Sequence, residues 1–164
     1  MDTLTVIIET PKNSRVKFDY DVQLQCFKLK KILPAGMVFP FDFGYIPGTK
    51  GADGDPLDVI AIAEFGTFTG CAIDCRIIGA ILAEQKEKGK EKIRNDRYFA
   101  IPLQSEIFKH VHEPGQLPKE LVDQLQEFFI NYNKAAQKDF KVLSIIGSKK
   151  ANSLIKKAGT TVNT

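Results

Sequence analysis

The sequence predicts an α+β protein in which a small closed or nearly closed β-barrel carries helices on its outside. Two features of the 164-residue chain lead to this prediction. Short β-branched segments recur through residues 4–102, and two amphipathic helical patterns follow them. No internal repeat or linker divides the chain, so residues 1–164 are expected to form a single domain.

Composition narrows the class of protein. Hydrophobic residues make up 43% of the chain and include 12 Phe, which supports a buried core, while the net charge of +3 is mild and suits an anionic substrate. Cys26, Cys71 and Cys75 lack metal-type spacing with histidine, and Cys71 and Cys75 are expected to be buried free thiols. There is no signal-peptide pattern and no run near the ~20 apolar residues that span a bilayer. We therefore expect a soluble cytoplasmic protein without a membrane partner.

The first expected elements are strands. Leu4–Glu9 is β-branched and stops before a proline, and Val16–Asp21 alternates apolar and polar residues. Gln23–Ile32 alternates in the same way and is expected to form a hairpin with Val16–Asp21. Phe39–Ile46 is dense in aromatic residues and contains one glycine, which indicates backbone packed closely against a neighbour.

Three further strands are expected before the helices. They are Val59–Ala63, Cys71–Leu82 with a bulge near Gly79, and Arg97–Pro102. Between the last two, Glu84–Asn95 carries mixed charges and is expected to be a solvated hairpin tip or loop rather than a nucleic-acid patch.

Two helices are expected near the end of the chain. The first begins around Pro118 and presents one broad apolar face. That face consists of Leu121, Val122, Leu125, Phe128, Phe129 and Tyr132. After a short strand over Val142–Ile146, Ser148 is expected to cap a second helix that ends at Gly159.

One acidic stretch stands out as a candidate site. Asp53, Asp55 and Asp58 lie within six residues, beside the turn formers Gly54 and Pro56 and directly before an apolar run. Carboxylates about 4 Å apart repel by up to ~1 kcal/mol per pair in water, so a chain normally separates them unless a cation lies between. Hard oxygens clustered at a strand end suit Mg²⁺ or a similar cation.

Two other structures are compatible with an acidic stretch of this kind. An ordinary solvated turn is the more common explanation for such a segment in an arbitrary chain. A calcium loop of the EF-hand type would use Asp53, Asp55 and Glu64 at its first, third and twelfth positions. It is excluded because Asp58 occupies the sixth position, where that loop requires glycine.

The surroundings of the acidic stretch point to a family. FPFDFGYIPGTKGADGDPLDV, residues 39–59, contains a D-x-D-P-x-D signature, and VIIE, KFDYD, AIP and LPKELVDQLQEFFINY follow the same order as in that family. The chain resembles a divergent family I soluble inorganic pyrophosphatase. The resemblance implies a five-stranded OB-like barrel with outer helices, pyrophosphate and phosphate as ligands, and dependence on Mg²⁺, with Mn²⁺ or another divalent cation as alternatives. It also implies a homo-oligomer, often a hexamer in prokaryotic members.

The resemblance also assigns roles to acidic residues. Asp53 and Asp58 match metal ligands, and Asp55 matches the group that helps deprotonate the attacking water. Glu9 and Asp19 match positions that hold further metal ions. Cations at such a site screen the approach of a nucleophile to a dense anion and stabilise the leaving phosphate.

Further positions match residues that contact phosphate. They are Lys17, Lys31, Tyr45, Arg97 and Tyr132. Outside the family context, Lys17 would more often be a solvated strand residue and Tyr132 a core-facing helix residue.

Several of these positions depart from the family pattern. Lys31 replaces an arginine and loses its bidentate fork, Arg97 replaces a lysine, Phe43 a tyrosine, and Asn133 a lysine.

At two positions where the family has metal-ligating aspartates, this sequence has Gln85 and Asn95. Asp96 is the first candidate to replace a missing ligand, ahead of Glu84, Glu87 and Glu91.

These features lead to one expectation and two alternatives. We expect Mg²⁺-dependent hydrolysis of pyrophosphate by a metal-activated water, with an activity that the departures weaken or alter. The first alternative is an inactive pyrophosphatase-like protein that binds a phosphorylated ligand or a protein partner. The second, single-stranded nucleic-acid binding, is disfavoured because Lys86–Arg97 offers only six basic against three acidic residues.

Overall fold

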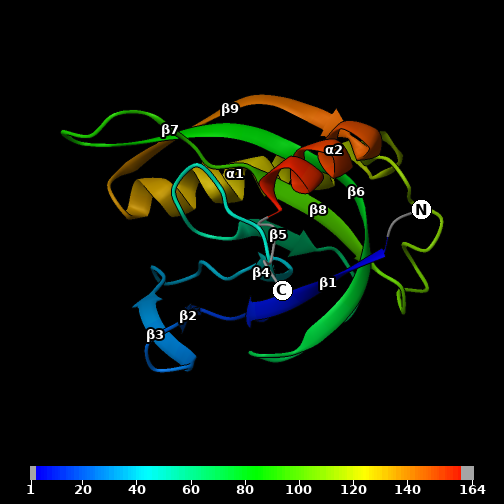
Figure 1. The fold of residues 1–164 in the computed structure, drawn as a ribbon, viewed down its shortest axis with the longest axis horizontal. Helices are drawn as coiled ribbons and strands as arrows, with labels where there is room; N and C mark the ends of the chain where they lie inside the picture. The colour runs from blue at the N-terminus through cyan, green and yellow to red at the C-terminus, as the bar shows by residue number, and fades with distance from the viewer. Residues whose placement is uncertain (1–2, 160–164) are drawn as a thin grey trace.

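The computed structural model describes residues 3–159, and its strands pair in a closed ring (Figure 1). The ring is closed because the first strand pairs with both the second and the last member. In spatial order its strands are β1 (Thr3–Thr10), β4 (Asp42–Ile46), β5 (Leu57–Ala61), β8 (Arg97–Pro102) and β6 (Ala72–Glu87). The predicted α+β fold, with five strands in a closed arrangement and helices outside, is confirmed.

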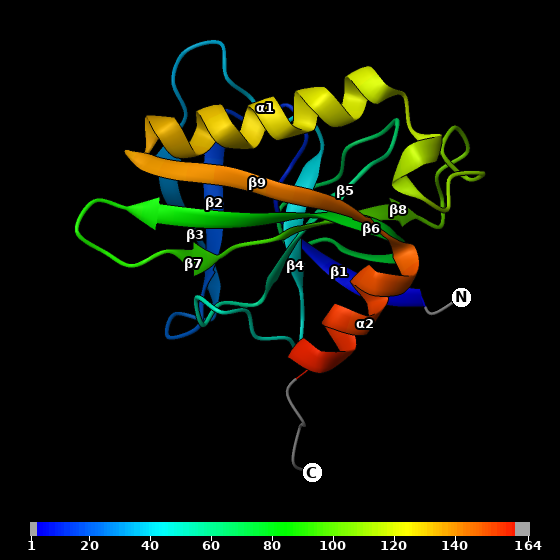
Figure 2. The same cartoon turned by 90° about the horizontal axis from the view of Figure 1, so that it is seen from above.

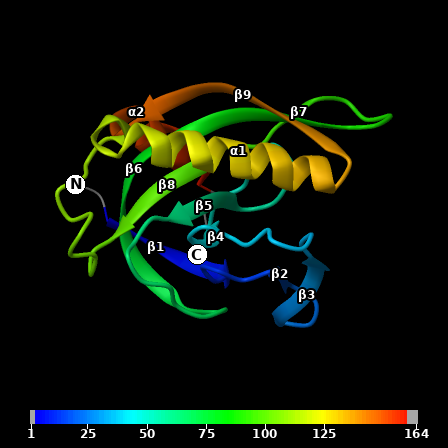
Figure 3. The ribbon, with the colours of Figure 1, turned by 180° about the vertical axis from the view of Figure 1, so that it is seen from behind.

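The remaining elements attach to this ring. β2 (Val16–Asp21) and β3 (Cys26–Ile32) form a separate hairpin. β7 (Ile93–Arg94) and β9 (Lys138–Gly147) both pair with β6. The helical elements are η1 (Pro114–Gln116), α1 (Lys119–Ala135) and α2 (Ser148–Ala158). Figures 2 and 3 show α1 running alongside β9, with α2 at the far end of that strand. Among the described residues, no helix has the length and apolar character needed to cross a membrane.

Alternation of side chains divides the core into two clusters. One gathers inward residues from every ring strand, such as Val6, Val59 and Tyr98, and includes Ala151 and Ile155 from α2. The other packs the opposite side chains of the strands against the apolar face of α1. Its members include Phe43, Ile60, Phe99, Leu125 and Phe129. The candidate site lies on the strand faces that belong to this second cluster.

Two predicted glycine positions are confirmed by their surroundings. A Cβ on Gly44 would lie 1.9 Å from the carbonyl oxygen of Ile7, so β4 packs against β1 at van der Waals contact. The register of β6 shifts between Ile77 and Gly79, which is the expected bulge. A Cβ on Gly79 would lie 2.3 Å from Pro114, so this bulge lets η1 approach the sheet.

Several predicted boundaries were wrong. The segment Glu84–Asn95 is a hairpin tip as expected, but its turn is shorter than predicted because β6 continues to Glu87 and pairs with β7 and β9. β9 is longer than Val142–Ile146, and β3 begins at Cys26 because residues before it form the hairpin turn. These polar ends follow the sheet because neighbouring strands supply their hydrogen bonds, a tertiary effect that side-chain patterning does not report.

Three smaller expectations can be compared with the structure. All three cysteines are free, Cys75 is buried as predicted, and Cys71 is only half-buried. Gly159 is the C-cap of α2, as predicted. The prediction that Ser148 caps α2 was wrong, because the N-cap is Gly147 and Ser148 is the first helical residue. The carboxylate of Glu113 performs the capping by accepting hydrogen bonds from the Ser148 backbone N–H and hydroxyl.

Candidate active site

The acidic loop is a tight, solvent-exposed turn that leads into β5. The Gly51 N–H donates to the Asp55 carbonyl at 2.7 Å, and the Asp55 N–H donates to Oδ1 of Asp53 at 3.1 Å. Gly54 has φ +89°, a left-handed conformation that favours glycine. The loop therefore leaves the carboxylates of Asp53 and Asp55 exposed while Asp58 is held in the first part of the strand.

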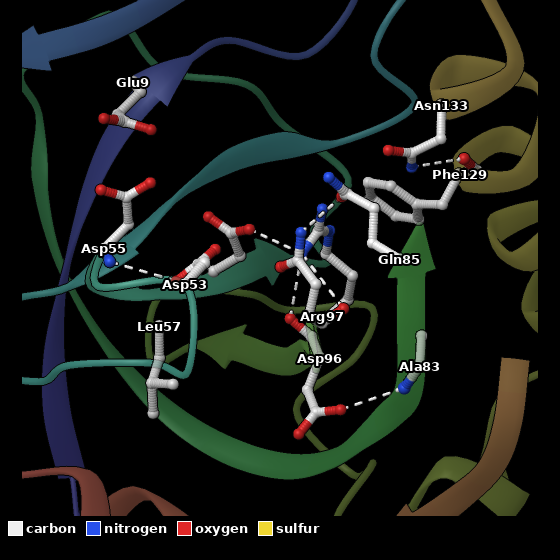
Figure 4. A network of polar contacts seen from close by, with 12 residues as sticks. Glu9, Asp53, Asp55, Leu57, Ala83, Gln85, Asp96, Arg97, Phe129 and Asn133 are labelled. Carbon is white, nitrogen blue, oxygen red and sulfur yellow. Dashed lines mark hydrogen bonds and ion pairs between the residues drawn. The ribbon is translucent and has the colours of Figure 1, made fainter. Parts of the chain in front are cut away.

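A second group of charges lies where β1 ends and β2 begins. Lys17 is 7% exposed, and its Nζ lies 3.5 Å from Oε2 of Glu9 and forms an ion pair with Asp19. The other oxygen of Glu9 accepts the Tyr20 N–H at 3.0 Å. The carboxylates of Glu9 and Asp55 point toward one another in Figure 4. The structure thus brings β1, β2 and the acidic loop to one charged region.

Register places three predicted site residues side by side on neighbouring strands. Tyr45 of β4 lies opposite Asp58 of β5, which lies beside Arg97 of β8. Arg97 is 4% exposed, and its Nη1 lies 2.6 Å from Oδ2 of Asp58. Its guanidinium carbon lies 5.8 Å from the ring centroid of Phe43 and 5.3 Å from that of Phe129. Because Lys17 Nζ also lies 5.3 Å from the Phe43 ring, this ring contacts both buried cations.

The amides that replace the expected aspartates form a hydrogen-bonded chain. Nδ2 of Asn95 donates to Oε1 of Gln85 at 2.7 Å, and Oδ1 of Asn95 accepts from Nη1 of Arg97. Asn133 is buried and donates to the Phe129 carbonyl of its own helix at 2.8 Å. Figure 4 shows Gln85 on β6 and Asn133 on α1 on the same side of Arg97. The sequence identifies the substitutions but not these hydrogen bonds, because they depend on the register of β6 against β7.

Asp96 has partners other than the acidic loop. Its Oδ1 accepts the Ala83 N–H at 3.0 Å, and both its oxygens accept from Nη2 of Arg94 at 3.0 Å. In Figure 4 its carboxylate points toward Ala83 and away from Asp53. The structure therefore brings Glu9, Asp19, Asp53, Asp55 and Asp58 to one region and does not bring Asp96 to them.

Two of the remaining phosphate-contact candidates, Lys31 and Tyr132, meet at α1. Tyr132 packs on Phe39 and Phe128, and Nζ of Lys31 lies 3.9 Å from the centroid of its ring. Burial raises the pKa of the Tyr132 phenol, and burial together with the nearby Lys138 and Lys17 charges lowers the pKa of Lys31. Tyr45 is half-buried, and burial together with the charge of Glu9 raises its pKa.

Three carboxyl groups of the site bind protons more readily than usual. Loss of water contact raises the pKa of Glu9, Asp55 and Asp58, and neighbouring carboxylates raise it further. Lys17 opposes this shift at each of them, and Arg97 opposes it at Asp58. Lys17 and Arg97 thus neutralise only part of the negative charge of these carboxylates, and further positive charge would neutralise the rest.

The donor set fits a hard divalent cation in its chemistry. All the acidic candidates offer carboxylate oxygens, which Mg²⁺ and Mn²⁺ accept as ligands. Between residues 3 and 159, however, no three His, Cys, Asp or Glu side chains are arranged closely enough to hold one ion. An ion bound to this arrangement would have fewer than three carboxylate ligands, and water or substrate oxygens would complete its coordination.

Comparisons with known proteins agree with this arrangement. The family model for inorganic pyrophosphatase matches residues 6–163. The inorganic pyrophosphatase of Halalkalibacterium halodurans is 34% identical over 139 residues, covering 85% of this chain and 82% of that protein. The crystal structure of the Thermus thermophilus inorganic pyrophosphatase has a TM-score of 0.86 at 27% identity, covering 95% of this chain and 88% of that one. The chain therefore belongs to the inorganic pyrophosphatase family.

Proposed function

We propose that the chain hydrolyses inorganic pyrophosphate to two phosphate ions by attack of a water molecule. The observation that carries this proposal is the placement of the exposed acidic loop beside the two buried cations Lys17 and Arg97. Family membership supports the same reaction. Because pyrophosphate is a dense anion, a site for it must combine fixed positive charge with a group that can accept a proton from water.

The acidic residues divide into ligands and a base. Mg²⁺, or Mn²⁺ or another divalent cation, would supply charge neutralisation and a lower pKa for the attacking water. Its protein ligands would come from Glu9, Asp19, Asp53 and Asp58, with at most two of them on any one ion in the arrangement of residues 3–159. Asp55 is exposed, has a raised pKa and accepts the proton from water, since a base with a pKa nearer the working pH transfers protons more effectively.

The cationic and phenolic residues bind and orient the phosphates. Lys17 and Arg97 are buried and held by carboxylates, so their charges are fixed before substrate arrives. Burial and the nearby positive charges of Lys138 and Lys17 lower the pKa of Lys31, and a bound phosphate group would oppose this shift. Tyr45 and Tyr132 complete the phosphate-contacting set as hydroxyl donors.

The direct test compares phosphate release by the wild type and by Asp55→Asn in millimolar Mg²⁺. Loss of the base is expected to slow release by about 100-fold or more. Asp123→Asn is the matched control, because Asp123 is an exposed acid on α1 whose partner is Lys119. Equal rates for wild type and Asp55→Asn, or release that survives a chelator, would contradict the proposal.

A second candidate function is supported by the amides. Gln85, Asn95 and Asn133 all direct hydrogen bonds to protein atoms, as expected if this part of the site no longer serves a metal. An inactive protein would bind pyrophosphate in calorimetry without releasing phosphate. Measured turnover that requires Asp55 excludes this candidate.

The resemblance also supports a homo-oligomer, hexameric as in prokaryotic members, and a cytoplasmic location. Sedimentation of the purified chain tests the first. Imaging of a tagged chain in cells tests the second.

A further inference from the structure

The guanidinium of Arg97 is held mainly through one of its nitrogen atoms. Nη1 contacts Oδ2 of Asp58 at 2.6 Å, the carbonyl of Asp96 at 3.1 Å, and the side-chain oxygen of Asn95. Its Nε is buried and has no hydrogen-bond partner within residues 3–159. The orientation of the Arg97 guanidinium is therefore set by Asp58 on one side and by Asn95 and Asp96 on the other.

Gln85 determines which atom Asn95 presents to Arg97. A carboxamide has a donor end and an acceptor end, and only the acceptor can face a guanidinium favourably. Because Nδ2 of Asn95 donates to Oε1 of Gln85 at 2.7 Å, its Oδ1 is turned toward Arg97. Gln85 is itself fixed in β6, where it pairs with Ile93 of β7 and with Phe140 of β9.

The absence of a net charge on the Asn95 side chain matters as much as its shape. A carboxylate at position 95 would compete with Asp58 for the guanidinium and add a negative charge beside it. The neutral amide instead orients Arg97 and leaves its charge for Asp58 and for substrate. Aromatic rings of Phe43, Phe129 and Phe140 surround the guanidinium carbon at 5.3 to 5.8 Å and keep water from screening this pair.

We propose that Gln85 and Asn95 are a positioning pair that holds Arg97 against Asp58. The Arg97 guanidinium then neutralises part of the Asp58 charge that a divalent cation would otherwise neutralise. The inference deepens the proposed function and rests on it for the role of Arg97 toward phosphate. Gln85 acts only through Asn95, and Asn95 acts through Arg97.

The first test is calorimetric titration of the purified proteins with Mn²⁺ in the absence of substrate. Asn95→Asp releases Asp58 from Arg97 and adds a ligand, so Mn²⁺ should bind about tenfold more tightly or with an additional site. Asn152→Asp is the matched control, because Asn152 is a half-buried amide of α2 that bonds to the Ser148 carbonyl. Equal Mn²⁺ binding by Asn95→Asp and Asn152→Asp would overturn the proposal.

The second test measures KM and kcat for pyrophosphate in variants that remove the hydrogen bonds. Gln85→Leu and Asn95→Leu should each raise KM by about tenfold, and the double variant should be no worse than Asn95→Leu. Gln85→Glu keeps an acceptor for Asn95 and should recover most of this loss, whereas Gln85→Leu has no acceptor. Additive losses, or no recovery, would overturn the pair even if Asn95→Asp failed to fold.

The two proposals fail in different ways. An inactive wild type would contradict pyrophosphate hydrolysis, whereas the Mn²⁺ titrations need no turnover and still decide whether the amides control the charge at Asp58.

Discussion

Asp58 and Arg97 occupy paired positions on the parallel strands β5 and β8, and their side chains meet at 2.6 Å. The pair joins the end of the acidic loop to the strand that follows the β6–β7 hairpin. β5 and β8 are adjacent strands of the ring, so their parallel pairing assembles this part of the site. The folding of the sheet and the charge balance of the site are therefore coupled through these two residues.

Replacing Arg97 should affect both activity and stability. Arg97→Met removes the buried cation and leaves Asp58 without its closest partner, so we expect a loss of about 10²-fold or more in kcat/KM and a lower unfolding temperature. Arg97→Lys keeps the charge but not the planar set of donors and should fall between wild type and Arg97→Met. Steady-state kinetics and thermal unfolding of the three proteins check the order. An Arg97→Met enzyme with normal kcat/KM would contradict a phosphate-contacting role.

The acid limb of the pH–rate profile should report Asp55. Loss of water contact and the charge of Asp53 raise its pKa above the ordinary value of 3.8, and a base works only when deprotonated. We expect kcat/KM to fall at a higher pH than an ordinary aspartate would give. Asp53→Asn removes one cause of the shift and should move this limb to lower pH. A limb that stays in place in Asp53→Asn would mean that another group controls it.

The same shift predicts a gain in stability from Asp55→Asn when divalent cations are absent. The folded state binds a proton at Asp55 more readily than the unfolded state does. The negative charge of Asp55 therefore lowers the free energy of unfolding as pH rises from the pKa in the unfolded state through the raised pKa in the folded state. Asp55→Asn should be more stable than wild type at neutral pH, by at most ~1 kcal/mol because the group is exposed. The difference should vanish at pH values below the ordinary carboxyl pKa and shrink when Mg²⁺ is added. Urea unfolding at several pH values provides the measurement.

A structural feature can be predicted from this sequence when the residues that form it are close together in the chain. The alternation of Val16–Asp21 and the acidic turn at residues 53–58 are local, and both appear where expected. The Glu113 cap of α2 joins residues 35 positions apart. Gln85 and Asn95 are polar residues in a charged segment, so neither periodicity nor turn chemistry indicates that they bind each other. The Gln85–Asn95 contact depends on the register of β6 against β7, which side-chain patterning does not report.

Glu113 should contribute to stability without contributing to catalysis. Hydrogen bonds from the Ser148 hydroxyl and N–H lower its pKa, so its contribution is present above the ordinary carboxyl value of 4.5 and is lost as pH falls through the lowered value. Glu113→Ala removes the cap of α2 and should reduce the free energy of unfolding by about 1 kcal/mol at pH 7. Pyrophosphate hydrolysis should be unchanged, as the capped helix end lies outside the charged region around Asp55. A loss of activity at full stability would show that the two regions are coupled.

Asp96 provides a test of which carboxylates serve the cation. Its oxygens accept hydrogen bonds from the Ala83 N–H and from Arg94, contacts that hold β7 beside β6. We expect Asp96→Asn to lower the free energy of unfolding by about 1–2 kcal/mol, because an amide is a weaker acceptor for Arg94, and to leave the Mg²⁺ concentration for half-maximal activity unchanged. Asp53→Asn is the comparison, since it removes a carboxylate from the acidic loop and should raise that Mg²⁺ concentration. If Asp96→Asn raised it while stability stayed the same, Asp96 would have to leave Arg94 during catalysis and act as the ligand expected from the sequence.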